Sequence, residues 1–109
     1  SAEIVNESIA IAIYDKEKAK DVSLICAKAA DELLTINDVT ASFVLGNTGD
    51  KICISGRSIG DINVQLILEK LGGGGHITLA GAQVDGMTTE EVKTELINRI
   101  NEYFSEMSS

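Results

Sequence analysis

The sequence predicts an α/β fold in a single domain, with a mixed central sheet of about four to five strands and about three helices. Apolar residues alternate with a period of two in some segments and recur at three- and four-residue spacing in others. No internal repeat or low-complexity linker divides this order. With 109 residues, of which 44% are hydrophobic, the chain has the length of one domain and enough apolar content for a core. Residues 1–109 are therefore expected to fold as one unit.

The chain begins with a predicted strand and a predicted helix. Residues 4–14 are rich in Ile and Ala and alternate in part, which predicts a strand that ends at Asp15. Small and apolar residues then recur at helical spacing, while Lys and Glu occupy the other faces. The members of this stripe are Ala19, Val22, Ile25, Cys26, Ala29, Ala30, Leu33 and Leu34. The small residues of this stripe would allow the helix to pack closely on a sheet.

A β-hairpin is predicted next. Residues 39–45 and 51–57 have the composition of strands, and residues 46–50 supply the Gly and Asn of a turn between them. Alternation along the second strand divides its side chains between two faces, with Ile52 and Ile54 on one and Cys53, Ser55 and Arg57 on the other.

The second half predicts a short helix and a strand. Asp61 is expected to cap a helix that extends to Leu71. After a run of glycines, residues 76–84 predict a strand with Ala80-Gly81-Ala82 in its middle, where another backbone or a ligand can approach closely.

The last helix has the clearest start signal. Thr88 and Glu91 form a capping box, and Met87 and Val92 a hydrophobic staple. A core-facing stripe follows, made of Val92, Leu96, Ile97, Ile100 and Phe104. The serine-rich residues 105–109 are predicted to be a frayed tail, and Ser1-Ala2 are compatible with a cloning remnant.

Composition narrows the classes of function. Cys26 and Cys53 lie on apolar positions outside any Cys-x-x-Cys pair, so we expect reduced, buried thiols and not a disulfide or a metal site. No stretch approaches the roughly 20 apolar residues of a membrane span, so the chain as given is expected to be soluble.

A net charge of −8 argues against a broad basic surface for nucleic acid. Residues 51–84 carry a small positive surplus, which suits a small phosphorylated ligand.

The most informative motif is the run Gly72-Gly73-Gly74-Gly75-His76, which follows the second helix and includes the chain's single His. One glycine suffices to end a helix, and each further glycine costs about 0.5–1 kcal/mol of folding free energy relative to Ala. A backbone that must approach another group closely offsets this cost. We therefore predict a phosphate cradle formed by successive N–H donors, with a flexible linker as the alternative.

Two further features are expected to join this cradle. Arg57 lies where a predicted strand ends, between Ser55 and Ser58, and its guanidinium suits a phosphate or a base edge. The predicted helix from Asp61 presents its N-terminal N–H groups, with Asn63 in the first turn. His76 can donate to a phosphate oxygen. Known nucleotide-binding loops do not match, and one His without clustered carboxylates is a poor acid–base or metal system.

These motifs resemble the DHHA1 domain, which accompanies the DHH domain in a family of phosphoesterases. The resemblance rests on Ser55-Gly-Arg-Ser58, on residues 62–66, on Gly72-Gly-Gly-Gly-His76 with Ala80-Gly81, and on residues 41–44, and it covers nearly the whole chain. It is strongest to the GdpP-type cyclic-di-AMP phosphodiesterases of Gram-positive bacteria. Leu79 and Gly81 depart from the residues usual there.

The resemblance implies a division of labour between two domains. The DHH domain binds two Mn²⁺ ions and hydrolyses cyclic di-AMP to pApA, and the DHHA1 domain holds the substrate. This chain would then lack catalytic and metal-binding residues, be inactive alone, and be the cytoplasmic part of a membrane-anchored bacterial parent. The implied substrate-binding residues are Arg57, Ser58, Asn63, Gly73, Gly74, Gly75, His76 and Thr78. The implied partners are cyclic di-AMP or pApA and the DHH domain of the same parent, with a homodimer as a further option.

Two alternatives stay open at this point. DHHA1 domains also accompany exonucleases, oligoribonucleases and alanyl-tRNA synthetases, so the chain could bind short single-stranded oligonucleotides. Its acidic balance and its scarcity of aromatic stacking residues count against this. In the other alternative, the chain is an interaction domain whose glycines are purely structural.

Overall fold

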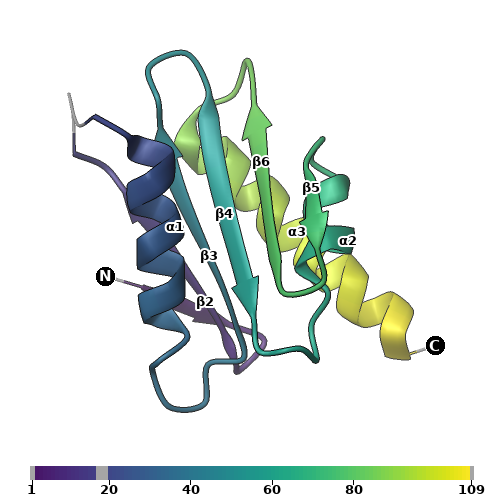
Figure 1. Cartoon of the computed structure of the whole chain (residues 1–109). Coiled ribbons are helices and arrows are strands. Elements are labelled where there is room, and N and C mark those ends of the chain that lie inside the picture. The colour runs from purple at the N-terminus through teal and green to yellow at the C-terminus, as the bar shows by residue number, and fades with distance from the viewer. Residues whose placement is uncertain (1, 17–19, 109) are drawn as a thin grey trace.

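The computed structural model describes residues 2–16 and 20–108. Ser1, Ala19 and Ser109, on which some expectations fell, lie outside the described residues. Nine elements follow one another in the described part: β1 (Glu3–Val5), β2 (Ile9–Tyr14), α1 (Val22–Leu33), β3 (Ala41–Asn47), β4 (Ile52–Ser58), α2 (Val64–Glu69), β5 (Gly74–His76), β6 (Leu79–Val84) and α3 (Thr89–Ser108). The strands form a single sheet in the order β1-β2-β3-β4-β6-β5. Figure 1 shows α1 in front of this sheet and α3 behind it.

The sheet is mixed, as predicted. β2 and β3 pair in parallel and are connected through α1, whereas every other neighbouring pair is antiparallel. The α/β class and the three helices are therefore confirmed. The sheet has six strands instead of four to five, because residues 3–14 and 74–84 each form a hairpin.

The first of these corrections concerns residues 4–14, predicted as one strand. The chain turns back at Asn6 and Glu7, whose φ angles of 48° and 69° are left-handed, and β1 pairs antiparallel with β2. Because the turn is so short, the alternation of apolar residues in the sequence looks continuous from one strand to the next. The one sequence signal for this turn is Asn6, because Asn adopts left-handed backbone angles more readily than most residues.

Strand alternation divides the core into two layers, one on each face of the sheet. The larger layer packs α2 and α3 against the sheet through residues such as Phe43, Ile54 and Leu96, each at most 2% exposed. The smaller layer packs α1 against β3 and β4 through Val22, Cys26, Ala30, Val44 and Cys53. The prediction that Ile52 and Ile54 lie on one face of β4 and Cys53 lies on the other is confirmed.

The two cysteines meet in the smaller layer. Both are buried and free, as predicted, and their Sγ atoms lie 4.0 Å apart. The hydrogen bond with Cys53, together with burial, raises the pKa of the Cys26 thiol. Both side chains are small and buried, which lets α1 approach the sheet closely. Gly46 helps this approach, because a Cβ there would lie 2.6 Å from Val22 Cγ1.

Helix ends confirm one predicted cap and correct another. The capping box of α3 is present: Glu91 N–H donates to Thr88 Oγ1 at 3.1 Å, and Thr88 N–H donates to Glu91 Oε1 at 2.8 Å. The expected frayed tail is helical up to Ser108, whose hydroxyl donates to the carbonyl oxygen of Phe104. In α2 the cap is Asn63 and not Asp61, because the extended Asn63 accepts the Leu66 N–H at 3.1 Å.

None of the helices within residues 2–16 and 20–108 has the combination of length and apolar character needed to cross a bilayer.

Candidate functional site

The glycine run begins with a helix cap. Gly72 has a φ of +83°, its N–H donates to the Glu69 carbonyl at 3.1 Å, and the N–H of Gly73 donates to the Leu68 carbonyl at 2.9 Å. This pair of bonds is a Schellman motif, which requires a left-handed residue at the position of Gly72. The first glycine therefore ends α2, as predicted.

Two more of the glycines are required by close packing against β6. A Cβ on Gly73 would overlap the carbonyl oxygen of Gly81 and lie 2.6 Å from Ala82 Cβ. A Cβ on Gly75 would overlap the carbonyl oxygen of Leu79, and Gly75 also has a φ of +146°. Both positions exclude any side chain for reasons internal to the fold. The sequence did not predict these contacts, because they depend on which strand lies beside the run.

Gly74 is the exception within the run. A Cβ built on it meets nothing within 4 Å, and its φ lies outside the positive range that favours glycine. The fold therefore gives no reason for glycine at this position. A ligand or another domain that must approach the backbone here would supply one.

The run also differs in shape from the expected cradle. Gly74–His76 is the extended strand β5, paired with β6 through a turn at Ile77 and Thr78, so it does not form a concave nest of N–H groups. The predicted single strand over residues 76–84 is likewise a hairpin. The glycines create a flat strand edge without side chains where a pocket of backbone donors was expected.

Strand register brings Arg57 and His76 onto one face of the sheet. Arg57 on β4 lies opposite Leu79 on β6, and Leu79 lies opposite His76 on β5. Residues directly opposite one another in antiparallel strands point to the same face. Arg57 and His76 are thus separated by two strand spacings, about 10 Å. Between them Leu79 is 50% exposed.

The next row on the same face has almost no side chains. Ser55 lies opposite Gly81, which lies opposite Gly74. This face is the one on which α1 packs, but α1 covers β3 and β4 and leaves β6 and β5 open (Figure 1). The row of Arg57, Leu79 and His76 and the row of Ser55, Gly81 and Gly74 together form what we call the open face.

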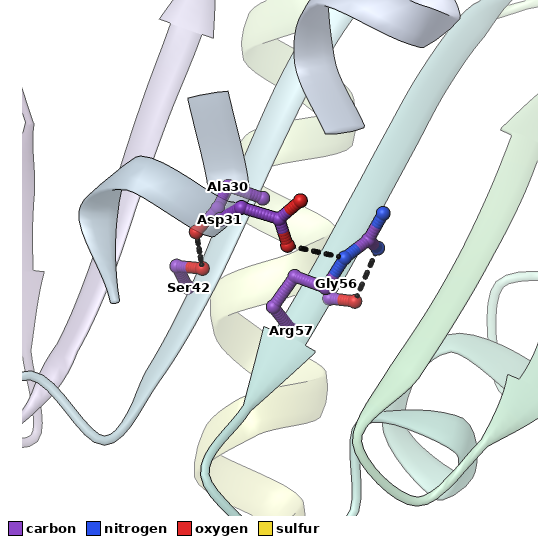
Figure 2. Close-up of polar contacts among 5 residues, drawn as sticks. All are labelled: Ala30, Asp31, Ser42, Gly56 and Arg57. Carbon is purple, nitrogen blue, oxygen red and sulfur yellow. Dashed lines mark hydrogen bonds and ion pairs between the residues drawn. The ribbon is translucent and has the colours of Figure 1, made fainter. Parts of the chain in front are cut away.

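Arg57 is held in place from α1. Its Nε donates to Asp31 Oδ1 at 2.9 Å, and its Nη1 donates to the carbonyl oxygen of Gly56 at 2.9 Å (Figure 2). The Arg57 side chain is only 13% exposed, whereas that of Asp31 is 63% exposed. These bonds use two of the five N–H donors of the guanidinium, so the others can bind an anion.

A buried hydroxyl supports this arrangement. Ser42, which lies opposite Arg57 on β3, donates through its Oγ to the carbonyl oxygen of Ala30 at 2.6 Å (Figure 2). The bond ties the last turn of α1 to the sheet one residue before Asp31. Neither Asp31 nor Ser42 was predicted as a site residue, because their role depends on the packing of α1 across β3 and β4.

Three predicted site residues lie elsewhere. Ser58 is 6% exposed and points away from the open face, and its hydroxyl bonds with the Ile77 carbonyl and the Gly60 N–H. Asn63 caps α2 through its side chain. Thr78 is exposed in the β5–β6 turn, where its carbonyl accepts the Ser58 N–H. The structure therefore groups Arg57, Gly74 and His76 on the open face and gives Ser58 and Asn63 internal bonds.

Ser55 is the hydroxyl that lies on the open face instead of Ser58. The alternation of β4 placed it there with Arg57, a signal that the sequence contained. Beside it lies a cavity of about 510 Å³, lined by Ser23, Cys53, Ile54, Ser55, Gly72, Gly73, Gly74, Gly81, Ala82 and Gln83. The described residues include no group of three or more His, Cys, Asp or Glu side chains that could hold a metal ion.

Comparison with known proteins places this geometry in a family. The model of the DHHA1 domain matches residues 6–106. The cyclic-di-AMP phosphodiesterase GdpP of Geobacillus thermodenitrificans is 48% identical over 104 residues, which cover 94% of this chain and 16% of that protein. The cyclic-di-AMP phosphodiesterase PdeA of Listeria monocytogenes is 44% identical over 105 residues, which cover 95% of this chain and 16% of that protein. The chain thus spans about one sixth of the length of these relatives.

A solved structure has the same fold. An exopolyphosphatase-related protein of Bacteroides fragilis superposes with a TM-score of 0.81 and 22% identity, over 99% of this chain and 33% of that one. At this identity the likeness concerns the fold alone. The match of the DHHA1 model over residues 6–106 shows that the chain belongs to the DHHA1 domain family.

Proposed function

We propose that the chain is the substrate-holding domain of a phosphodiesterase that hydrolyses cyclic di-AMP to pApA. The observation that carries this proposal is the open face, where Arg57 and His76 flank a strand edge whose Gly74 has no internal reason to be glycine. The similarity to GdpP and PdeA, both cyclic-di-AMP phosphodiesterases, supports the choice of substrate.

In this proposal the open face binds the phosphate groups and orients them. Arg57 provides a fixed cation, because Asp31 and the Gly56 carbonyl restrain its guanidinium before any ligand binds. A restrained donor loses little conformational entropy on binding. His76 donates a hydrogen bond from the neighbouring strand edge, and Gly74 lets a ligand oxygen or ring approach the backbone.

The chemical step belongs to a separate domain in this proposal. A DHH domain of the same parent would supply two Mn²⁺ ions and the attacking water, and the present chain would be inactive without it. We further propose that the parent is anchored in the bacterial membrane with this domain on the cytoplasmic side.

Titration with pApA, followed by amide NMR shifts of the 109-residue chain, tests the proposal. The largest shifts are expected at residues 55–57, 74–76 and 79–81, because these residues form the open face. The helices on the opposite face provide an internal control. Shifts confined to α2 and α3 would contradict the proposal.

The same titration separates this function from that of a general single-strand binder. If the open face fits a dinucleotide, affinity should level off at two nucleotides in a series of single-stranded oligomers. A steep rise in affinity with length would favour the nucleic-acid-binding alternative, since each added phosphate or stacked base contributes to such sites.

A further inference from the structure

The two thiols between α1 and β4 are the strongest feature that the proposed function leaves unused. Both are free in the structure, which therefore shows their reduced form. We propose that Cys26 and Cys53 are an oxidisable pair, in which a hydroperoxide oxidises Cys53 and Cys26 then closes a disulfide bond with it. The chemistry of this pair does not depend on nucleotide binding at the open face.

The two sulfur atoms are close enough to react after a small movement. Their separation is 4.0 Å, and a disulfide bond is about 2.0 Å long. Gly46 lies opposite Cys53 on β3, and a Cβ there would lie 2.7 Å from Cys26 Sγ. The absence of a side chain at Gly46 therefore leaves room for the sulfurs to approach each other.

A small oxidant can reach one of the two sulfurs. Cys53 lines the cavity of about 510 Å³, whereas Cys26 is fully buried and is not among the residues of its wall. Ser23, Gly74 and Gln83 also line this cavity and are exposed, so it is open to solvent. A hydroperoxide is little larger than water, which occupies about 30 Å³ in the liquid. Cys53 is therefore the thiol that a dissolved hydroperoxide meets first.

Hydrogen bonding makes the accessible thiol the more acidic one. The bond between the two thiols, with a further bond from the Ser23 hydroxyl, lowers the pKa of Cys53. The same thiol–thiol bond, together with burial, raises the pKa of Cys26. Because the thiolate is the nucleophilic form of cysteine, the acidity and the accessibility both select Cys53 for the first step.

The reaction has two steps. In the first, the Cys53 thiolate attacks one peroxide oxygen, the O–O bond breaks, and Cys53 becomes a sulfenic acid. The hydroxide that leaves takes up the proton that Cys53 released on ionisation. In the second step, Cys26 Sγ attacks Cys53 Sγ and the S–O bond breaks. The departing hydroxide takes the Cys26 proton and leaves as water, so that one peroxide is reduced and two thiols are oxidised.

The resulting bond would connect α1 to β4 and close a loop over residues 26–53. A cross-link of this kind stabilises a domain mainly by restricting its unfolded chain, and the melting temperature should rise by roughly 5–15 °C. Asp31, which restrains Arg57, lies on the same helix. Oxidation would therefore also fix the helix that holds the Arg57 side chain.

Hydrogen peroxide is the probe for the first experiment. The reduced 109-residue chain is treated with it under native conditions, remaining thiols are alkylated in denaturant, and the product is analysed by mass spectrometry. We expect both thiols to disappear together and the tryptic peptides 21–28 and 52–57 to be linked. Melting temperatures are compared before and after treatment with dithiothreitol, which reduces the disulfide but not methionine sulfoxide.

Two matched variants test the order of the steps. Serine is close to cysteine in size and keeps a hydroxyl that can hydrogen-bond the remaining thiol. In Cys26→Ser, the sulfenic acid on Cys53 should persist and react with dimedone. In Cys53→Ser, peroxide should leave Cys26 unmodified, with dimedone labelling lower by about tenfold or more.

The wild-type result decides the proposal even if a variant fails to fold. The proposal is overturned if native wild type keeps both thiols in peroxide, or if the two peptides become linked only in denaturant. It is also overturned if the oxidised chain melts below the reduced one, because the bond would then distort the native packing. Equal dimedone labelling of the two folded variants would contradict the assignment of Cys53 as the thiol that reacts first.

Discussion

Replacing Gly73 with alanine should destabilise the domain by roughly 3 kcal/mol, at the upper end of what overpacking costs in a protein core. The added methyl would overlap the Gly81 carbonyl oxygen and lie 2.6 Å from Ala82 Cβ. Backbone on both sides would have to move, because no flexible side chain is available to yield. For a domain of this size the melting temperature should fall by about 10 °C or more, measured by circular dichroism.

Gly74→Ala is the matched control for this prediction, since it places the same methyl one residue further along the run in open space. The account of the glycine run is wrong if the two variants melt at the same temperature. Equal stability would mean that β5 packs less closely against β6 than the structure shows.

Arg57→Ala should weaken pApA binding by about 10- to 100-fold, the range expected for losing a hydrogen bond to a charged group. Arg57 shares its row with Leu79 and His76. When His76 is neutral, the Arg57 guanidinium is the only cation on this row. Stability should also fall, by about 1–2 kcal/mol, because the Arg57 side chain is only 13% exposed and loses its packing together with its bonds to Asp31 and the Gly56 carbonyl. Isothermal titration of the 109-residue chain with pApA measures the first effect, and thermal melting the second.

Lys51→Ala serves as the control cation. Lys51 precedes β4 at its other end and lies 4.0 Å from Asp85, away from the row of Arg57. Its removal changes the net charge equally but should leave affinity nearly unchanged at physiological salt. If both variants lose the same affinity, Arg57 acts only through the overall charge of the domain and not as a direct contact.

Local signals in the sequence predicted most of the fold. The capping box of α3, the alternation of β4 and the small residues of α1 all reflect short-range chemistry, and the structure confirms each of them. The hairpins at residues 3–14 and 74–84 were missed because each joins short strands through two or three residues. The cap of α2 was misplaced by two residues because Asp61 and Asn63 are both good caps, and the extended backbone of Asn63 decides between them.

The site was harder to predict for a physical reason. Arg57 and His76 could be singled out by residue type, but their common face follows from register across three strands. Ser58 was preferred over Ser55 by proximity to Arg57 in sequence, although alternation alone puts Ser55 on its face. Asp31 reaches Arg57 only because α1 crosses the sheet at that point. Long-range packing of this kind leaves no local pattern in a single sequence.

The glycine run shows what structure adds to such a motif. Its sequence suggested that three glycines exceeded the need of a helix cap. The fold accounts for Gly72, Gly73 and Gly75 and leaves Gly74 as the one position of the run where the fold does not require glycine. The glycines that lack a structural reason are therefore reduced from three to one.

Gly74→Ala tests this central claim most directly, because it should separate binding from folding. The variant is expected to melt at or slightly above the wild-type temperature, since Ala in place of Gly at a compatible position stabilises by about 0.4–1 kcal/mol. Its affinity for pApA should nevertheless fall by about tenfold or more, because the methyl occupies the surface on which the ligand lies. A variant that keeps both its melting temperature and its affinity for pApA would contradict the account.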